Sequence, residues 1–266
     1  MSARSRPHIP TARRSNPFSH RWKVLVGVAA VALAFLAATP VASATYTLRI
    51  SPPFLGVEPI LATTIDTVGC HSRAEFPLAP RVNATNGEIH ERLGASSRYC
   101  AGSPAGPNYA DVAAFPGFNG TNFTVPASGL YTATYEWVFS YNASLNASGP
   151  VDTGYLTSSA TAIVSLFALG YLYDRTNATV LDGNGGSAVV LFHEIHEGSW
   201  TGGAVRLSVR LVNSFALVTG HLYYFETVLT VNAEGLTNVD GNASATLNLG
   251  TSGDHARLVG LALVGP

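Results

Sequence analysis

The chain has 266 residues with 15 basic and 16 acidic side chains, and its formal net charge is −1. Six of the basic residues precede residue 45, so residues 45–266 carry nine arginines and no lysine against all 16 acidic residues. This acidic remainder excludes nucleic acid as an expected partner, because binding to phosphate backbones requires a basic face. The missing lysines exclude Schiff-base chemistry and the phosphate-binding lysine of nucleotide loops.

The first 44 residues have the composition of an export signal. Basic residues precede an apolar run over residues 24–38, and Ala42 and Ala44 satisfy the small-residue requirement of a signal peptidase. We expect cleavage after Ala44 and a secreted or cell-surface protein. The alternative is an uncleaved helix that anchors the protein in a membrane, because the apolar run with residues 39–41 reaches about the lower limit for a transmembrane helix.

Apolar and polar side chains alternate with a period of two in much of the remaining sequence, which is typical of strands with one buried and one solvated face. In residues 131–141 this alternation places five aromatic side chains on one face, Tyr131, Tyr135, Trp137, Phe139 and Tyr141. We predict that they form core and not a ligand platform, since in water they would make an unusually large apolar patch. Strands are predicted at residues 46–50, 61–68, 123–125, 131–141, 156–168, 187–196, 204–212, 221–232, 243–249 and 256–263.

Glycine-containing dipeptides lie between several of these runs and predict hairpin turns, because glycine readily adopts positive φ. They occur at residues 182–183, 202–203, 240–241 and 252–253. Many strands joined by tight turns predict a single all-β domain over residues 45–266, an antiparallel β-sandwich of jelly-roll type.

Residues 69–117 differ from the rest because they are rich in proline and glycine and irregularly charged. We predict an irregular segment there, and a segment of this kind in a compact domain is often functional. Cys70 and Cys100 are the only cysteines of the chain. In an exported protein they are expected to form a disulfide, which would contribute about 3 to 4 kcal/mol in the chain-entropy model.

Asparagine followed two positions later by serine or threonine is unusually frequent. Residues 45–266 contain 14 asparagines and 40 serines and threonines, so chance predicts about 2.5 such N-glycosylation patterns, whereas seven occur. The excess favours N-glycans, although a preference for these residue types in turns would account for part of it. The seven candidate sites are Asn83, Asn119, Asn122, Asn142, Asn146, Asn177 and Asn242.

One short motif resembles a known family of domains. Phe123, Val125, Pro126, Gly129 and Tyr131 fit the F-x-V-P-x-S-G-x-Y pattern that precedes a long strand in jelly-roll domains. Tumour-necrosis-factor-like domains, complement-head domains and many carbohydrate-binding modules have this pattern, so the resemblance implies a β-sandwich. The whole chain is also similar to secreted archaeal glycoproteins that are rich in Asn-Ala-Thr/Ser and poor in lysine, and that similarity implies no activity.

His193 and His196 are candidate metal ligands because carboxylates lie beside them in His193-Glu-Ile-His-Glu197. On a strand, residues three apart point to opposite faces, and the H-E-x-x-H spacing of helical zinc sites is absent. We therefore interpret the segment as a polar strand end and expect no metal or other cofactor.

Glu136 and Glu226 each lie among aromatic residues of a predicted strand, and paired carboxylates can hydrolyse glycosidic bonds. We interpret both as residues of solvated strand faces and expect no catalytic residues. The sequence thus favours a non-catalytic secreted or cell-surface glycoprotein domain with a structural or adhesive role in the envelope. The alternatives are a carbohydrate-binding module and a jelly-roll glycosidase, and the expected partners are glycans or other cell-surface proteins.

Overall fold

The computed structural model describes residues 45–54, 63–68, 71–99, 108–149, 151–152, 157–158, 160–181, 186–237, 241–251 and 253–266. These residues belong to one compact unit that begins at Thr45. The predicted export signal, Cys70 and Cys100 lie outside the described residues. Within the described ranges, no helix is long and apolar enough to span a membrane.

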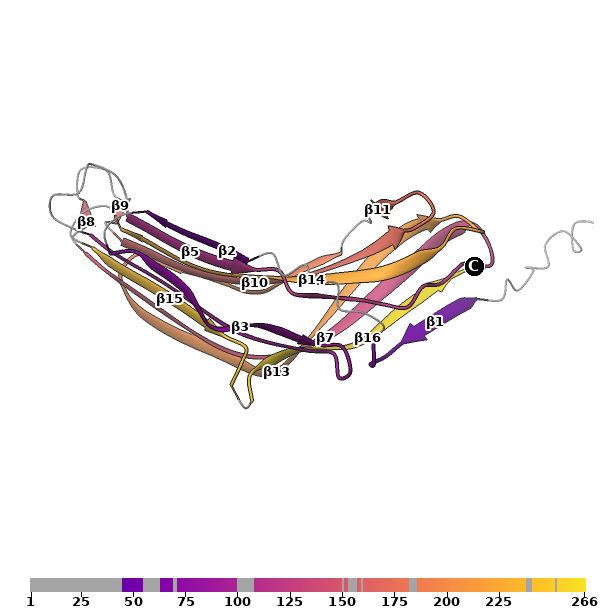
Figure 1. Cartoon of the computed structure of the whole chain (residues 1–266), viewed down its shortest axis with the longest axis horizontal. Helices are drawn as coiled ribbons and strands as arrows, with labels where there is room; N and C mark the ends of the chain where they lie inside the picture. The colour runs from indigo at the N-terminus through magenta and orange to yellow at the C-terminus, as the bar shows by residue number, and fades with distance from the viewer. Residues whose placement is uncertain are drawn as a thin grey trace, which may run out of the picture. The chain divides into compact units, whose positions relative to one another are not determined.

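Sheet A consists of seven strands, β1 (Tyr46–Ile50), β3 (Arg73–Asn83), β4 (Glu88–Arg98), β7 (Gly129–Ser148), β13 (Gly198–Leu217), β15 (Asn242–Asn248) and β16 (His255–Gly265). The long strand β7 pairs with β13 along one edge, whereas β16 and β15 share its other edge. Beyond β16 the sheet continues with β1, and beyond β15 it continues with β4 and β3 (Figure 1). All these pairings are antiparallel.

Sheet B also has seven strands, β2 (Thr63–Val68), β5 (Asn108–Ala114), β6 (Gly117–Asn119), β10 (Ala160–Asp174), β11 (Thr179–Leu181), β12 (Ser187–Ile195) and β14 (Tyr223–Thr237). Its centre is the antiparallel pair of β10 and β14. β5 and β6 pair with the other edge of β14, and β11 and β12 pair with the other edge of β10. A separate small hairpin consists of β8 (Val151–Asp152) and β9 (Thr157–Ser158).

The core lies between the inner faces of sheets A and B. Tyr131 and Tyr135 of β7 are fully buried, and Trp137 is 1% exposed. The ring of Tyr135 meets Phe225 of sheet B edge-on at 5.8 Å, and the ring of Trp137 lies 6.0 Å from that of Phe118. Aromatic contacts at these distances stabilise beyond the burial of area alone. The prediction that the aromatic row of residues 131–141 is core is therefore confirmed, as is the all-β antiparallel sandwich.

The predicted irregular segment 69–117 is wrong in its described part, because β3, β4 and β5 and the first residue of β6 fall within it. The regular alternation of apolar and polar residues that predicts strands is interrupted in β3 and β4 for two reasons. The pairing of β3 with β4 contains register shifts, which interrupt the alternation. In β4 the inward positions include the polar residues Glu91 and Ser97. β4, β5 and β6 are stabilised by pairing with β14, β15 and β16, which are distant in sequence, and β3 pairs with β4.

The predicted turn at residues 202–203 is also wrong, because both glycines lie inside β13 and pair with β7. Glycine is required there for close packing. A Cβ on Gly202 would lie 2.2 Å from the ring of Trp200, and one on Gly203 would lie 2.7 Å from the carbonyl oxygen of Tyr141. The predicted strand at 123–125 is reduced to one bridge between Phe123 and Tyr223.

Candidate functional site

Three grooves with described linings open on the outer face of sheet A, and each includes two residues of β7. Residues 134 and 136 line the first groove, 138 and 140 the second, and 146 and 148 the third. Alternate residues of a strand face the same side and lie about 7 Å apart. The grooves therefore follow one another along the outer side of this strand.

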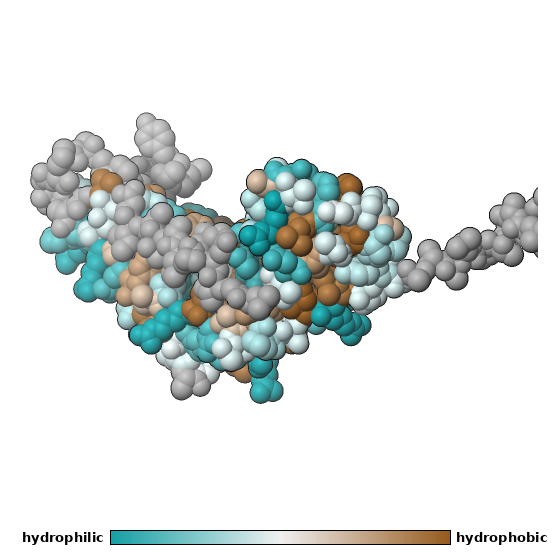
Figure 2. Space-filling view, turned by 45° about the vertical axis from the view of Figure 1, so that its right-hand side comes forward, coloured by the Kyte–Doolittle hydropathy of each residue, from teal (hydrophilic) through white to brown (hydrophobic). Residues whose placement is uncertain are grey.

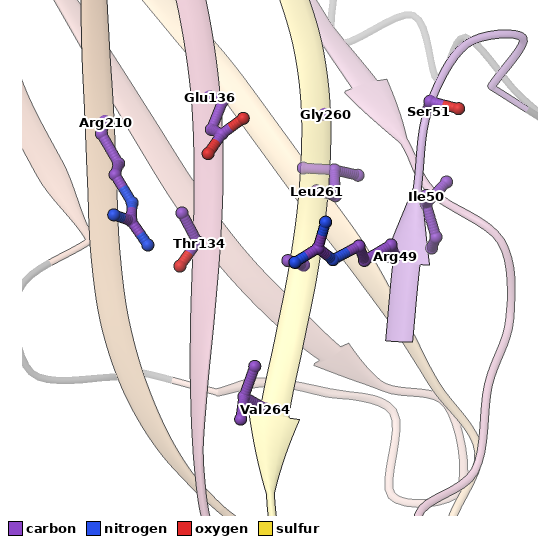
Figure 3. A pocket seen from close by; sticks show the side chains of 10 residues that line it. Arg49, Ile50, Ser51, Thr134, Glu136, Arg210, Gly260, Leu261 and Val264 are labelled. Carbon is purple, nitrogen blue, oxygen red and sulfur yellow. The ribbon is translucent and has the colours of Figure 1, made fainter. Parts of the chain in front are cut away.

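The first groove, the Arg49 groove, has a volume of about 390 Å³ and extends across four neighbouring strands, β1, β16, β7 and β13. Arg49 of β1 and Arg210 of β13 lie on its two sides, with Thr134 and Glu136 of β7 between them (Figure 3). The other lining residues, mostly apolar, are Ile50, Ser51, Gly260, Leu261, Ala262 and Val264.

The second groove, the His255 groove, has a volume of about 670 Å³ and lies between β13, β7, β16 and the start of β4. Its floor combines aliphatic and hydroxyl side chains, and its polar groups include two arginines. The lining residues are Glu88, Val138, Ser140, Val205, Arg206, Ser208, Gly253, His255, Arg257 and Val259.

A β-bulge shapes the His255 groove. The register of β13 against β7 shifts between Ala204 and Leu207, and Arg206 within the bulge has a φ of 56°. A residue with a side chain adopts this left-handed conformation only at a cost of about 1 kcal/mol or more. The hydroxyl oxygen of Ser140 accepts a hydrogen bond from the backbone N–H of Arg206 at 3.2 Å and so stabilises the bulge. The bulge brings Arg206 into the groove lining, and strained residues of this kind concentrate at functional sites.

The third groove, the serine groove, has a volume of about 380 Å³ and is almost entirely polar. Two of its lining residues, Asn146 and Asn242, are predicted glycosylation sites, so N-glycans there would cover this groove. Its complete lining is His71, Ser96, Ser97, Arg98, Asn146, Ser148, Asn242, Ala243 and Ser244.

The Arg49 and His255 grooves concentrate positive charge on an acidic domain. Their linings contain four of the nine arginines of residues 45–266 and two of the 16 acidic residues, Glu88 and Glu136. A local surplus of arginine favours anionic or strongly polar ligands, because guanidinium groups donate several hydrogen bonds in a fixed planar geometry. We refer to these two grooves together as the groove face.

Exposed apolar side chains of the described residues do not form one continuous surface where Figure 2 leaves them in view. Figure 2 shows hydrophobic residues in small groups separated by hydrophilic ones. Val205, which is 87% exposed, lines the His255 groove, whereas Phe192 is exposed on β12 of sheet B. Scattered exposed apolar residues of this kind are normal for a folded domain.

Glu136 and Glu226 are not brought together. Glu136 points outward from sheet A into the Arg49 groove. Glu226 lies on the outward side of β14 in sheet B, because its neighbours Phe225 and Thr227 are buried on the inner side. The two carboxylates therefore lie on opposite outer faces of the sandwich, about one sheet-packing distance apart or more. This arrangement does not supply a pair of carboxylates to one substrate.

A different pair of carboxylates was missed by the sequence reasoning. Asp111 of β5 and Glu234 of β14 are directly paired on the outer face of sheet B, and both are half-buried. Burial, together with the charges of Asp111 and Glu194, raises the pKa of Glu234. The two residues are 123 positions apart in the sequence, so only the pairing register of β5 with β14 reveals them as neighbours.

The structure separates the two candidate metal ligands. His193 stacks on the ring of Trp200 at 4.0 Å. His196 is exposed, its Nε2 atom lies 3.3 Å from Glu194, and its Nδ1 atom lies 3.1 Å from the hydroxyl of Thr161. No group of three histidine, cysteine or acidic residues suited to a metal ion occurs among the residues that the structure describes.

All seven candidate glycosylation sites lie in described parts of the chain, and six are exposed, whereas Asn119 is half-buried. Asn142 and Asn146 lie within β7, contrary to the turn positions typical of such sites, with their side chains outward. At Asn177 the side-chain nitrogen donates a hydrogen bond to Asp174 at 3.0 Å. Asp174 is buried and also contacts Nδ1 of His221 at 2.8 Å.

Glu91 is a buried acid that no sequence pattern indicated. Its side chain points into the core from β4, is fully buried, and neither carboxyl oxygen has a hydrogen-bond partner. Burial raises the pKa of Glu91 to about 8. At neutral pH the carboxyl group is therefore mostly protonated and uncharged.

No protein-family model and no curated protein sequence matches the chain. Among solved structures, a carbohydrate-binding module of lichenase 5A from Cellvibrio mixtus, in complex with cellotriose, is 10% identical, with a TM-score of 0.24, over 71% of this chain and 95% of that one. The C-terminal carbohydrate-binding module of a marine laminarinase from Zobellia galactanivorans is 14% identical, with a TM-score of 0.19, over 72% of this chain and 99% of that one. TM-scores this low support no conclusion about the function of this chain.

Proposed function

We propose that this domain is a non-catalytic, adhesive module of an exported glycoprotein, and that it binds glycan chains along the groove face of sheet A. The observation that carries the proposal is the succession of two open grooves along residues 134–140 of β7. Six residue steps of a strand span about 20 Å. This length accommodates a short stretch of an extended oligosaccharide.

The side chains on this face suit a ligand rich in hydroxyl groups. Thr134, Ser140 and Ser208 present hydroxyls, Glu136 presents a carboxylate, and the arginines present donors. Polar groups of both kinds, acceptors and donors, are what a saccharide requires for hydrogen bonding. Because the aromatic row of β7 is core, binding would depend on hydrogen bonds and charge instead of stacking on that row.

The export of the protein is supported by its sequence, through the basic leader with Ala42 and Ala44 and through the seven glycosylation patterns. The exposure of six of these asparagines supports the same proposal. Glycans on Asn146 and Asn242 would cover the serine groove and confine the binding site to the groove face.

A bulky substitution tests the proposed site. Ser208 is exposed and lines the His255 groove, so Ser208→Trp should fill that groove without disturbing a buried group. The matched control is Ser187→Trp on β12 of sheet B, which is also exposed. We expect the full chain to be retarded by at least one polysaccharide in affinity electrophoresis, Ser208→Trp to abolish the retardation, and Ser187→Trp to leave it unchanged. A chain that no polysaccharide retards, or an equal loss in both variants, would refute the proposal.

Glycoside hydrolysis is the second candidate function, and the pairing of Asp111 with Glu234 favours it. Directly opposed carboxylates, one with a raised pKa, have the form of a retaining acid and nucleophile pair. Hydrolysis assays on the same polysaccharides would decide between the two. Release of reducing ends by the full chain, and its loss in a folded Glu234→Gln variant, would make the domain an enzyme and move its active site to sheet B.

A further inference from the structure

Two arginines converge on the Arg49 groove from opposite sides. Their strands are separated by β7 and β16, so the backbones of Arg49 and Arg210 lie about 14 Å apart across the sheet. Both guanidinium groups lean over the groove toward each other, and the hydroxyl of Thr134 lies between them (Figure 3). This convergence places two positive charges over one small area of the surface.

Within the described part of the chain, the two arginines are not ion-paired, although Glu136 is the cross-strand neighbour of Arg210. Neither guanidinium forms a hydrogen bond within these described ranges, and Glu136 lines the same groove. Other arginines of the domain are engaged, as Arg73 is with Glu75 and Arg257 is with the carbonyl oxygen of Asn86. Two like charges that face each other across a groove repel, and an anion between them would remove that repulsion.

The rest of the groove favours a saccharide over a simple anion. Glu136 offers two acceptor oxygens beside the arginines, and its negative charge repels a simple anion. Hydrogen-bond donors on the ligand would offset that repulsion by binding to the carboxylate. Sugar hydroxyls are such donors. Gly260 lies opposite Glu136 in the sheet and leaves this part of the floor free of a side chain, so that a ring can approach the backbone.

We infer that the Arg49 groove binds the negatively charged group of an acidic saccharide, a carboxylate or a sulfate ester, between Arg49 and Arg210, while Glu136 accepts hydrogen bonds from the hydroxyls of the same unit. This assignment rests on the glycan binding proposed above and gives it a substrate class. The fork of a guanidinium group matches a carboxylate or a sulfate with two parallel hydrogen bonds. Neutral saccharides would leave both arginines unneutralised and should bind more weakly.

The test compares three ligands on the full chain by titration calorimetry. Oligogalacturonate supplies carboxylates, dextran sulfate supplies sulfate esters, and carboxyl-reduced oligogalacturonate is the matched neutral ligand. We expect at least one acidic ligand to bind about tenfold or more tightly than the neutral one, since hydrogen bonds between charged groups are stronger than those between neutral groups. Tighter binding of oligogalacturonate assigns the carboxylate, and tighter binding of dextran sulfate assigns the sulfate ester. Binding should weaken as ionic strength rises.

Substitutions of single arginines test whether the preference for acidic ligands depends on Arg49 and Arg210. Arg49→Gln and Arg210→Gln should each lower affinity for the acidic ligand about tenfold, whereas affinity for the neutral ligand should not change. Arg49→Lys should lose less than Arg49→Gln, because it keeps the charge but not the planar fork. The matched control is Arg175→Gln, an exposed arginine next to sheet B that should leave affinity unchanged.

The outcomes separate this inference from the proposed function. Equal binding of neutral and acidic saccharides, or acidic binding that neither Arg49→Gln nor Arg210→Gln weakens, overturns the inference and leaves glycan binding intact. Failure of the full chain to bind any of the three ligands, or the polysaccharides tested above, overturns both. Melting temperatures of the variants should match that of the parent chain, since both arginines lie on the surface.

Discussion

The hydroxyl of Tyr135 donates a hydrogen bond to the carbonyl oxygen of Tyr171 and so connects β7 of sheet A with β10 of sheet B. The tyrosine ring packs directly on Gly170, where a Cβ would lie 2.6 Å from ring atoms. Burial, and secondarily the charge of Glu226, raises the pKa of Tyr135 well above its usual value, so the donor stays protonated at neutral pH. This contact fixes the strand that carries the groove face relative to the opposite sheet.

Removing that hydroxyl tests its contribution. Tyr135→Phe should lower the free energy of unfolding by about 1 to 3 kcal/mol, because the carbonyl of Tyr171 loses a buried donor. Tyr173→Phe is the matched control, since Tyr173 is half-buried on the outer face of β10. Urea unfolding of the two variants measures the difference. Equal stability of Tyr135→Phe and the parent chain would contradict a stabilising role for the hydrogen bond.

The buried carboxyl of Glu91 predicts a stability that depends on pH. Its pKa is about 8 in the folded chain against an ordinary value of 4.5, so the folded state holds a proton that the unfolded state releases. The contribution of protonated Glu91 to the free energy of unfolding is fully present below about pH 4.5. It is lost as pH rises through the folded pKa of about 8. The total loss is on the order of 5 kcal/mol.

Glu91→Gln removes this titration, so its free energy of unfolding should change less between pH 5 and pH 8 than that of the parent chain. Unfolding in urea at several values of pH measures both slopes. Glu197→Gln, which replaces an exposed carboxylate, is the control and should keep the slope of the parent chain. Identical slopes in Glu91→Gln and the parent would show that Glu91 does not titrate as described.

The strained bulge in β13 predicts that replacing Arg206 with glycine raises the stability of the domain and weakens its binding of glycans. Glycine adopts positive φ without a steric cost, so Arg206→Gly should raise the free energy of unfolding by up to about 1 kcal/mol. The same variant loses a guanidinium from the His255 groove and should bind glycans more weakly. Arg206→Gln, which removes the charge but keeps an ordinary side chain in the strained conformation, separates the effect of charge from that of strain. A gain of stability with unchanged binding would mean that the bulge has no functional role.

The burial of Trp137 predicts a structural role for the aromatic row. Trp137→Ala should cost about 3 to 5 kcal/mol, because it opens a cavity beside Phe118 and Phe139. Thermal unfolding measures the loss. If this variant kept its melting temperature but lost polysaccharide binding, the aromatic row would be a binding platform and not core.

Glycosylation is predicted to differ between the candidate asparagines. Intact-mass and peptide analysis of protein from its native host should detect several glycans, with Asn242, which is exposed, among the modified residues. Occupancy at Asn177 should be lower, because its side-chain nitrogen is bonded to the buried Asp174. An unmodified mass would mean that the asparagine patterns reflect turn and strand chemistry alone. The Cys70 to Cys100 disulfide stays a prediction, and labelling of thiols under denaturing, non-reducing conditions tests it.

The sequence by itself determined most of the strands, since β1 matches its predicted bounds, β7 and β16 include theirs, and β15 includes all of its predicted range except residue 249. It also determined that Tyr131, Tyr135 and Trp137 are core. The physical reason is local: a strand with one buried face must alternate, and large aromatic side chains belong on that face. In β3 and β4, register shifts and inward polar residues interrupt the alternation, so the sequence pattern was not sufficient to predict these strands.

Only the tertiary structure decided which residues share a site. Arg49, Glu136 and Arg210 are separated by up to about 160 positions, and the strand order β1, β16, β7, β13 brings them into one groove. The same holds for Asp111 with Glu234 and for the burial of Glu91. Strand order and register between distant segments depend on how two whole sheets bury their inner faces together, and no short stretch of sequence contains that information.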